Sequence, residues 1–204
     1  MSQKKIGIFG GAFDPPHNAH VALAQTALAE LELDALHVIP TGQAWHKARA
    51  LSAPEHRLAM AKLAFAGMAS VVVDDRELKR AGPTFTIDTL EALQAENPSA
   101  LLYLVMGADQ FAAFKQWHKW QAILEIATIC VAARAHYDWA SGLNDPENWF
   151  KGRVLTLPMP PMSVSATQIR QRLASGLGEN QRLTDLLPAA VASYIAQHQL
   201  YPTT

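Results

Sequence analysis

Short apolar runs recur along this chain, and each has the length of a strand that is buried on both faces. The five clearest runs are residues 5–10, 35–40, 70–74, 101–106 and 128–133. A weaker run at 153–157 predicts one more short strand. The intervals are long enough for helices, so the pattern predicts an α/β fold, an open doubly wound parallel sheet of the Rossmann-like order 3-2-1-4-5.

Helical periodicity fills the first interval, after Pro16. Apolar residues at Val21, Ala24, Leu28 and Leu31 are spaced by three, four and three positions, which is typical of a helix with one buried face. We therefore expect a strand–helix–strand unit at the start of the chain, with the right-handed crossover that such units nearly always have.

Helix-start signals place several later helices. Ser52 and Glu55 resemble a capping box opening a helix that runs to about residue 65, and Ser165 and Gln168 resemble another. Further helices are expected at about 86–95, within the aromatic-rich stretch 110–127, and after Pro188. Residues 41–53 and 136–152 are predicted loops.

Composition limits the classes of function. The 204 residues suit a single domain, with a C-terminal helical part at about 158–204. The net charge of −1 offers no basic surface for a nucleic-acid polymer, and no apolar run approaches the roughly 20 residues of a membrane span. The first residues do not resemble a signal peptide, so we expect a cytoplasmic protein. The lone cysteine, Cys130, is expected to be buried.

Two glycine turns are expected at the centre of the predicted sheet. Gly10-Gly11 follows the first strand, and Gly107-Ala108-Asp109 follows the fourth. In the order 3-2-1-4-5 these strands are neighbours, and ligands of such sheets bind at the point where the winding reverses. The two turns should therefore converge on one cleft that admits an anion close to the backbone.

His17 and His20 are three residues apart and share one face of the first helix. They suit a pair of metal ligands, two histidines without a role, or two donors to phosphoryl oxygens. A metal site would need further ligands, and the sequence offers no clear cluster, so no metal site is predicted. The preceding glycines favour the third interpretation.

Two motifs carry a resemblance to a known group of enzymes. GGAFDPPHNAH resembles the G-x-F-D-P-x-H-x-G-H motif of the nucleotidyltransferase α/β-phosphodiesterase superfamily, and SATQIR resembles its second motif, I-S-x-T-x-I-R. ELKRAGPTFTIDTL, GADQF, Trp117 and the closing LPAAVASYIAQHQLY are similar to bacterial nicotinate-nucleotide adenylyltransferases. Departures are Ala19 in place of glycine, TGQAW at 41–45 and Ala135-His136.

The resemblance implies transfer of AMP from ATP to nicotinate mononucleotide, with magnesium accompanying ATP. It implies that His17, His20 and Arg170 are catalytic. The residues that it implies for ATP binding are Gly10, Gly11, Phe13, Lys47, Gly107, Asp109, Arg134, Ser165 and Thr167. Those that it implies for the mononucleotide are Thr86, Trp117 and His118.

Alternatives stay open at this stage. A sister transferase could use nicotinamide mononucleotide or phosphopantetheine as acceptor, and a nucleotide-sensing module could keep the fold without catalysis. The second class would predict loss of a motif histidine or of Arg170, and all three are present. The partners expected are small molecules, and a homo-oligomer is left open.

Overall fold

The computed structural model describes residues 3–42, 51–133, 150–160, 162–175, 183 and 185–202. Within these ranges the strands are β1 (Lys5–Gly11), β2 (Ala35–Pro40), β3 (Val71–Val73), β4 (Leu101–Gly107), β5 (Ala127–Ala133) and β6 (Val154–Pro158). The helices are α1 (Asn18–Leu31), α2 (Pro54–Phe65), α3 (Arg76–Lys79), α4 (Thr86–Glu96), α5 (Ala108–Ala112), the 3₁₀ helix η1 (Phe114–Gln116), α6 (Trp120–Ile126), α8 (Ala166–Ala174) and α9 (Ala189–Gln197).

The described strands form one parallel sheet in the order β3-β2-β1-β4-β5-β6. This confirms the predicted order, and β6 adds the expected last strand beside β5. β1 lies at the centre, where Ile6 is aligned with Ala35 of β2 and with Leu102 of β4. The winding reverses between β1 and β4, which places a crevice beyond their carboxyl ends.

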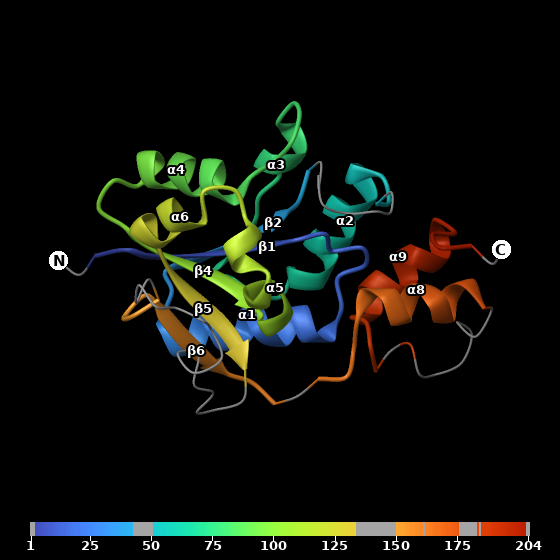
Figure 1. Ribbon diagram of the computed structural model, residues 1–204. Helices are drawn as coiled ribbons and strands as arrows, with labels where there is room; N and C mark the ends of the chain where they lie inside the picture. Colours follow the sequence, from blue (N-terminus) through green and yellow to red (C-terminus); the bar gives the residue numbers. More distant parts are fainter. Residues whose placement is uncertain are drawn as a thin grey trace.

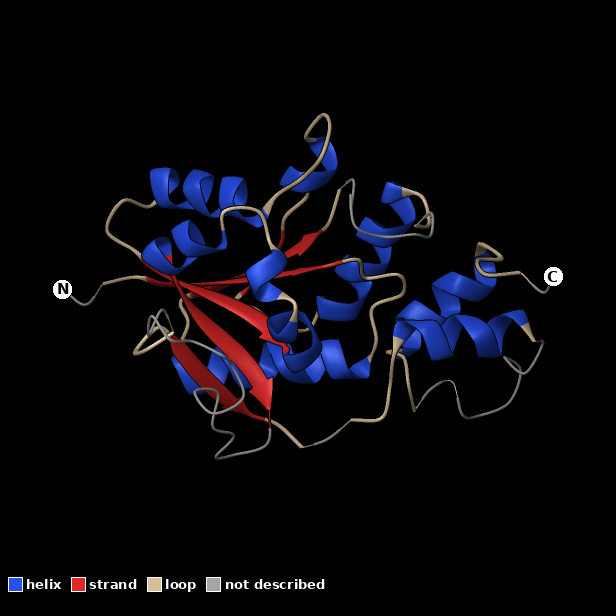
Figure 2. Cartoon of the chain, in the orientation of Figure 1, coloured by secondary structure: helices blue, strands red, loops and turns tan. Residues whose placement is uncertain are grey.

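Helices cover both faces of the sheet (Figures 1 and 2). Along β1 the side chains alternate, so that Ile6 and Ile8 join the core under α4 and α6, and Phe9 joins the core against α1. In β4, Leu104 and Val105 divide between the same two cores. This period of two is what a strand buried on both faces requires.

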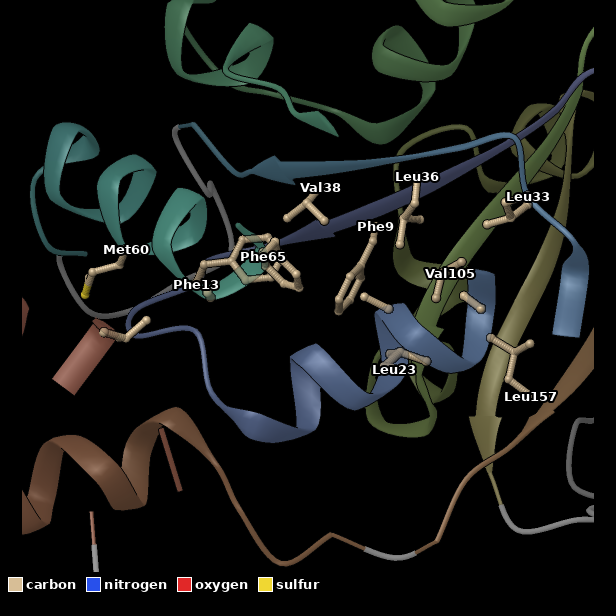
Figure 3. Close-up of a cluster of buried hydrophobic side chains, with 14 of the residues drawn as sticks. Phe9, Phe13, Leu23, Leu33, Leu36, Val38, Met60, Phe65, Val105 and Leu157 are labelled. Atoms are coloured by element: carbon tan, nitrogen blue, oxygen red, sulfur yellow. The ribbon is translucent and has the colours of Figure 1, made fainter. Parts of the chain in front are cut away.

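The core on the α1 face extends beyond the end of β1 (Figure 3). Phe13 packs edge-to-face on Phe9 at 5.4 Å and on Phe65 of α2 at 6.0 Å between ring centroids. Ile169 of α8 with Val191 and Ile195 of α9 belongs to the same cluster. The two C-terminal helices, α8 and α9, are therefore anchored to the core on the α1 face. Figure 1 shows them beside the sheet and not over it.

The buried face of α1 differs in part from its prediction. Ala24 and Leu31 are buried as expected, whereas Val21 and Leu28 are only partly buried. Leu23 and Ala27 are buried in their place. The buried face of α1 is thus rotated from the predicted one toward Ala24 and Ala27, whose small side chains let the helix approach the sheet closely. The spacing of apolar residues does not reveal this rotation.

Gly10 and Gly11 are the last two residues of β1, so the strand ends one residue later than predicted and the pair does not form the predicted turn. The two glycines are aligned with Ile39 and Pro40 of β2. The left-handed position falls at Phe13, with φ 47°. A Cβ on Gly11 would lie 3.1 Å from the Phe13 ring, whereas one on Gly10 would meet open space. Gly107 likewise closes β4.

The predicted capping box at Ser52 is also wrong. α2 begins at Pro54, its N-cap is Ala53, and no side chain caps it. Ser52 is used in tertiary contacts instead: its N–H donates to Asp14 Oδ2 at 3.2 Å, and its carbonyl accepts from Arg57 Nε at 3.0 Å. Pro54 at the first helical position has no N–H group that would need a partner. The helix can therefore begin without a cap from Ser52.

The remaining expectations are largely met. Cys130 is fully buried, and burial raises the pKa of its thiol to about 12. The charged stretch after β3 contains the short helix α3, which was not predicted, and the aromatic stretch divides into α5, η1 and α6. Among the helices of the described ranges, none combines the length and the apolar character that crossing a lipid bilayer requires.

Candidate active site

A cavity of about 1100 Å³ opens beyond the carboxyl ends of β1 and β4. Every predicted site residue within the described ranges lines it. These are Gly10, Gly11, Phe13, His17, His20, Thr86, Gly107, Asp109, Trp117, His118, Ser165, Thr167 and Arg170. Lys47 and Arg134 lie outside the described residues, as do most of the 41–53 loop and positions 135–149. Segments up to 160 residues apart in the sequence therefore meet in one cleft.

Among the described helices, the short α5 begins at this cavity with Gly107 as its N-cap, and three longer helices begin there too. They are α1 with N-cap His17, α4 with its first residue Thr86, and α8 with N-cap Ser165. The first turn of each helix carries N–H groups without intrahelical partners and the positive end of the helix dipole. The cavity thus has a positive potential from the backbone alone, and such a site favours phosphate or carboxylate groups.

The two motif histidines form a stacked pair at the start of α1. Their ring centroids lie 3.7 Å apart with an interplanar angle of 19°. The His17 backbone N–H donates to His20 Nδ1 at 3.1 Å, so His20 fixes the helix start as a capping residue does. This bond occupies Nδ1 of His20 as an acceptor, which puts the ring proton of a neutral His20 on Nε2. The Phe13 ring packs edge-on against His20 at 5.1 Å.

Burial decides the charge of His17. The side chain is 7% exposed, and desolvation lowers the pKa of its imidazole from 6.5 to about 4. Its Nδ1 atom has no hydrogen-bond partner among the described residues. A buried polar atom that lines a cavity without a partner is costly unless a ligand completes its contacts. His17 therefore offers a neutral imidazole with an unfulfilled contact to whatever binds here.

Arg170 is held at the cavity wall by the first motif and by its own helix. Its Nη1 donates to the Asp14 carbonyl at 2.7 Å, and its Nη2 donates to Thr167 Oγ1 at 3.0 Å. Ser165 Oγ accepts from the Gln168 N–H at 3.2 Å, which confirms the predicted N-cap. The first and second motifs are thus joined directly, with a fixed cation beside a helix start.

The other end of the cavity is aromatic. Trp117 is half-buried and packs on Phe114 at 5.6 Å, while the exposed His118 packs on Phe85 at 4.4 Å, immediately before Thr86 and α4. A flat indole next to a helix start suits a planar ring that carries a negative group. The acidic Asp109 lies across the cavity after β4, and a Cβ on Gly107 would lie 2.7 Å from its Oδ1.

Sequence reasoning missed several polar groups around the cavity. Glu77 lines it and is buried, with Thr89 Oγ1 donating to Oε1 at 2.9 Å; burial raises the pKa of this carboxyl. Arg57 is 2% exposed and donates to the carbonyls of Ala12 and Thr41. Burial lowers the pKa of its guanidinium, and the nearby Asp14 carboxyl opposes that shift. Only Asp14 carried a signal, because it belongs to the first motif.

The described residues contain no group of three or more His, Cys, Asp or Glu that would hold a metal ion. Asp109 is the exposed carboxylate that faces the cavity. Mg²⁺ in phosphate-transfer sites typically takes one or two protein carboxylates and keeps phosphate oxygens and water as its other ligands. Magnesium that is carried by a polyphosphate can take its ligands from phosphate oxygens and water, so it needs no dedicated group of protein ligands.

Fold and cavity define an α/β protein that binds a phosphate-bearing ligand with an aromatic ring. The family model described as cytidylyltransferase-like matches residues 8–172. Relatives named "Probable nicotinate-nucleotide adenylyltransferase" include one of Albidiferax ferrireducens, 54% identical over 98% of this chain and 99% of that protein. Another, of Bordetella petrii, is 43% identical over 97% and 99%. The chain belongs to the cytidylyltransferase-like family and, within it, to the nicotinate-nucleotide adenylyltransferases.

Solved structures agree on the fold. The nicotinic acid mononucleotide adenylyltransferase of Plasmodium falciparum complexed with APC superposes with a TM-score of 0.78 at 20% identity, covering 98% of each chain. The same enzyme complexed with NaAD gives a TM-score of 0.78 at 19% identity over the same shares. At this identity the likeness supports the architecture of the sheet and its helices.

The buried state of His17 gives a testable prediction. A pKa lowered to about 4 means that folding stability contributed by the neutral ring is present above pH 6.5 and is lost as the pH falls toward 4. The loss amounts to about 3 kcal/mol, at 1.36 kcal/mol per pKa unit. NMR titration should show the His17 ring neutral above pH 5, and His17→Asn should flatten the stability profile between pH 6.5 and 4. A His17 ring that titrates near 6.5 would contradict this account.

Proposed function

We propose that this chain transfers the AMP group of ATP to nicotinate mononucleotide, releasing pyrophosphate and forming deamido-NAD, as a step of NAD biosynthesis in the cytoplasm. The observation that carries the proposal is that helix starts, His17, His20, Arg170 and the aromatic Trp117 line one cavity. The names of the close relatives support the same activity. The substrates are small molecules, and magnesium enters with ATP.

In the proposed reaction an oxygen of the mononucleotide's phosphate attacks the α-phosphorus of ATP. A new P–O bond forms there, and the bond from that phosphorus to the oxygen that bridges to the β-phosphorus breaks, so that pyrophosphate leaves with the bonding electron pair. Both reactants are anions, so the barrier is largely electrostatic, and positioning with charge neutralisation is the main task of the site. The chemistry requires no side-chain nucleophile.

We assign the transferring phosphoryl group to His17 and His20. Because the His17 ring is neutral, it does not repel the His20 ring electrostatically, which allows their stacked arrangement at 3.7 Å. A bound triphosphate would supply negative charge next to the rings and raise the pKa of His17, because a nearby opposite charge favours the charged form. The pair can therefore gain positive charge when the substrate arrives.

The leaving pyrophosphate is assigned to the second motif. Arg170 is charged at any working pH and has a planar fork of donors that matches phosphate oxygens. The first turn of α8, with Ser165 and Thr167, supplies backbone N–H groups beside it. Gly10, Gly11 and Phe13 would lie along the triphosphate, because the open space at Gly10 lets the backbone approach closely. Asp109 is assigned to the ribose of the adenosine.

Lys47 and Arg134 remain in the proposal as additional cations near the phosphates, on the strength of the motif resemblance. The nicotinate ring is assigned to the aromatic end, stacked on Trp117. Its carboxylate would meet backbone N–H groups at the start of α4 near Thr86 and at His118. A nicotinamide lacks this negative charge, and a helix start gains most from an anion, so the site favours the acid.

An assay of pyrophosphate release tests the proposed reaction. With ATP and magnesium, nicotinate mononucleotide should give the highest kcat/KM, nicotinamide mononucleotide a value at least tenfold lower, and phosphopantetheine none. Tenfold corresponds to roughly 1.4 kcal/mol, which a single lost charge-assisted contact can account for. Faster turnover with phosphopantetheine would point to a sister transferase, and no release with any acceptor would point to a nucleotide-binding module.

Replacing His20 by Ala tests the phosphate end. We expect kcat to fall by about 10²- to 10³-fold, as is typical for loss of one preorganised donor to a developing negative charge. Trp117→Ala is the matched variant at the other end, and it should raise the KM for the mononucleotide more than the KM for ATP. Steady-state kinetics with each substrate varied in turn measures both. Near-normal turnover in His20→Ala would remove this residue from the chemistry.

A further inference from the structure

A buried carboxylate behind the cavity joins three distant parts of the chain. Asp14 is 1% exposed. Its Oδ1 accepts the hydroxyl proton of Tyr201 at 2.6 Å, and its Oδ2 accepts the Ser52 N–H at 3.2 Å. Tyr201 stands at the end of the closing stretch LPAAVASYIAQHQLY, to which the mechanism assigns no part. The contact spans 187 positions of sequence.

The backbone of the same residue holds the cation of the second motif. Asp14 O accepts from Arg170 Nη1 at 2.7 Å, so a displacement of Asp14 moves the acceptor that orients the guanidinium. Three residues later the chain reaches His17, the N-cap of α1. Asp14 and Arg170 line the cavity, whereas Tyr201 is not among its lining residues. The hydrogen bond to Asp14 therefore links the Tyr201 hydroxyl to the wall of the cavity.

We propose that Tyr201 is a positioning residue, whose hydroxyl fixes Asp14 and through it the orientation of Arg170 toward the phosphates of the nucleotide. The inference rests on the proposed function and adds to it a part played by the C-terminal segment. Figure 1 shows that this segment follows α9, beside α8, on the side of the molecule away from the N-terminus. The end of the chain is thereby part of the support of the phosphate site.

Two local features suit Tyr201 to this task. Its backbone has φ 57°, a left-handed conformation that a residue with a large side chain rarely adopts, so local preference does not account for its placement. Burial and the adjacent carboxylate raise the pKa of its phenol well above the ordinary value. The hydroxyl therefore keeps its proton at any working pH and remains a donor to Asp14.

The chain offers a matched control. Tyr194 of α9 is also half-buried, and its hydroxyl lies 2.9 Å from His56 Nδ1, but neither of these two residues lines the cavity. Tyr194→Phe and Tyr201→Phe delete the same single oxygen atom from the same region of the protein. A general effect of loosening the C-terminal segment should appear in both variants, and a positioning effect only in the second.

The experiment measures kcat, both KM values, thermal stability and the Kd of a non-hydrolysable ATP analogue for the full chain and the two variants. Tyr201→Phe should lower kcat about ten- to a hundredfold, the range expected when a hydrogen bond to a charged group is lost. It should weaken binding of the analogue and leave the KM for nicotinate mononucleotide within about twofold. Tyr194→Phe should keep wild-type kinetics.

A double-mutant cycle with Asp14→Asn completes the test. Because both groups act through one hydrogen bond, adding Tyr201→Phe to Asp14→Asn should cost little more than Asp14→Asn alone. Equal kinetics and analogue affinity in wild type, Tyr201→Phe and Tyr194→Phe would overturn the inference, and so would fully additive losses. A wild type that binds the analogue but transfers no AMP would instead contradict the proposed function, while analogue affinities would still decide the role of Tyr201.

Discussion

A parallel sheet places the carboxyl ends of all its strands at one edge, and the helices that follow some of those strands begin at the same edge. This constraint gives the protein its positive cavity before any charged side chain is considered. The starts of α1, α4 and α8 converge there, and α1 is the helix that follows the central strand β1 in the chain. Two anionic substrates can then share one cleft, because the field that accepts them is built into the fold.

At the same edge of the sheet, Arg170 and His17 differ in charge. Arg170 is a permanent cation, oriented by the Asp14 carbonyl and by Thr167. His17 is neutral because burial lowers its pKa to about 4. Several permanently charged cationic side chains in one site would repel one another in the absence of ligand. A site in which an imidazole gains charge on binding avoids most of that cost, and it places the new charge where the phosphoryl group is transferred.

Much of the architecture could be predicted because it depends on local pattern. Apolar runs located the strands, their order is the usual one of doubly wound sheets, and Ser165 marked the start of α8. The failures have a common cause in tertiary contacts: Ser52 is bound by Asp14 and Arg57 instead of capping α2, and Gly10-Gly11 continues β1 because β2 is available to pair with it. The hydrogen bond between Tyr201 and Asp14 could not be predicted from a periodic pattern, because the two residues are 187 positions apart.

We propose that the cavity beyond β1 and β4 holds the triphosphate between the two motifs. A crystal structure with a non-hydrolysable ATP analogue and magnesium tests it directly. The account predicts phosphate oxygens within about 3.2 Å of a ring nitrogen of His17 or His20 and of the Arg170 guanidinium in the same complex. A triphosphate bound elsewhere, or bound in the cavity with both imidazoles and Arg170 out of contact, would contradict it.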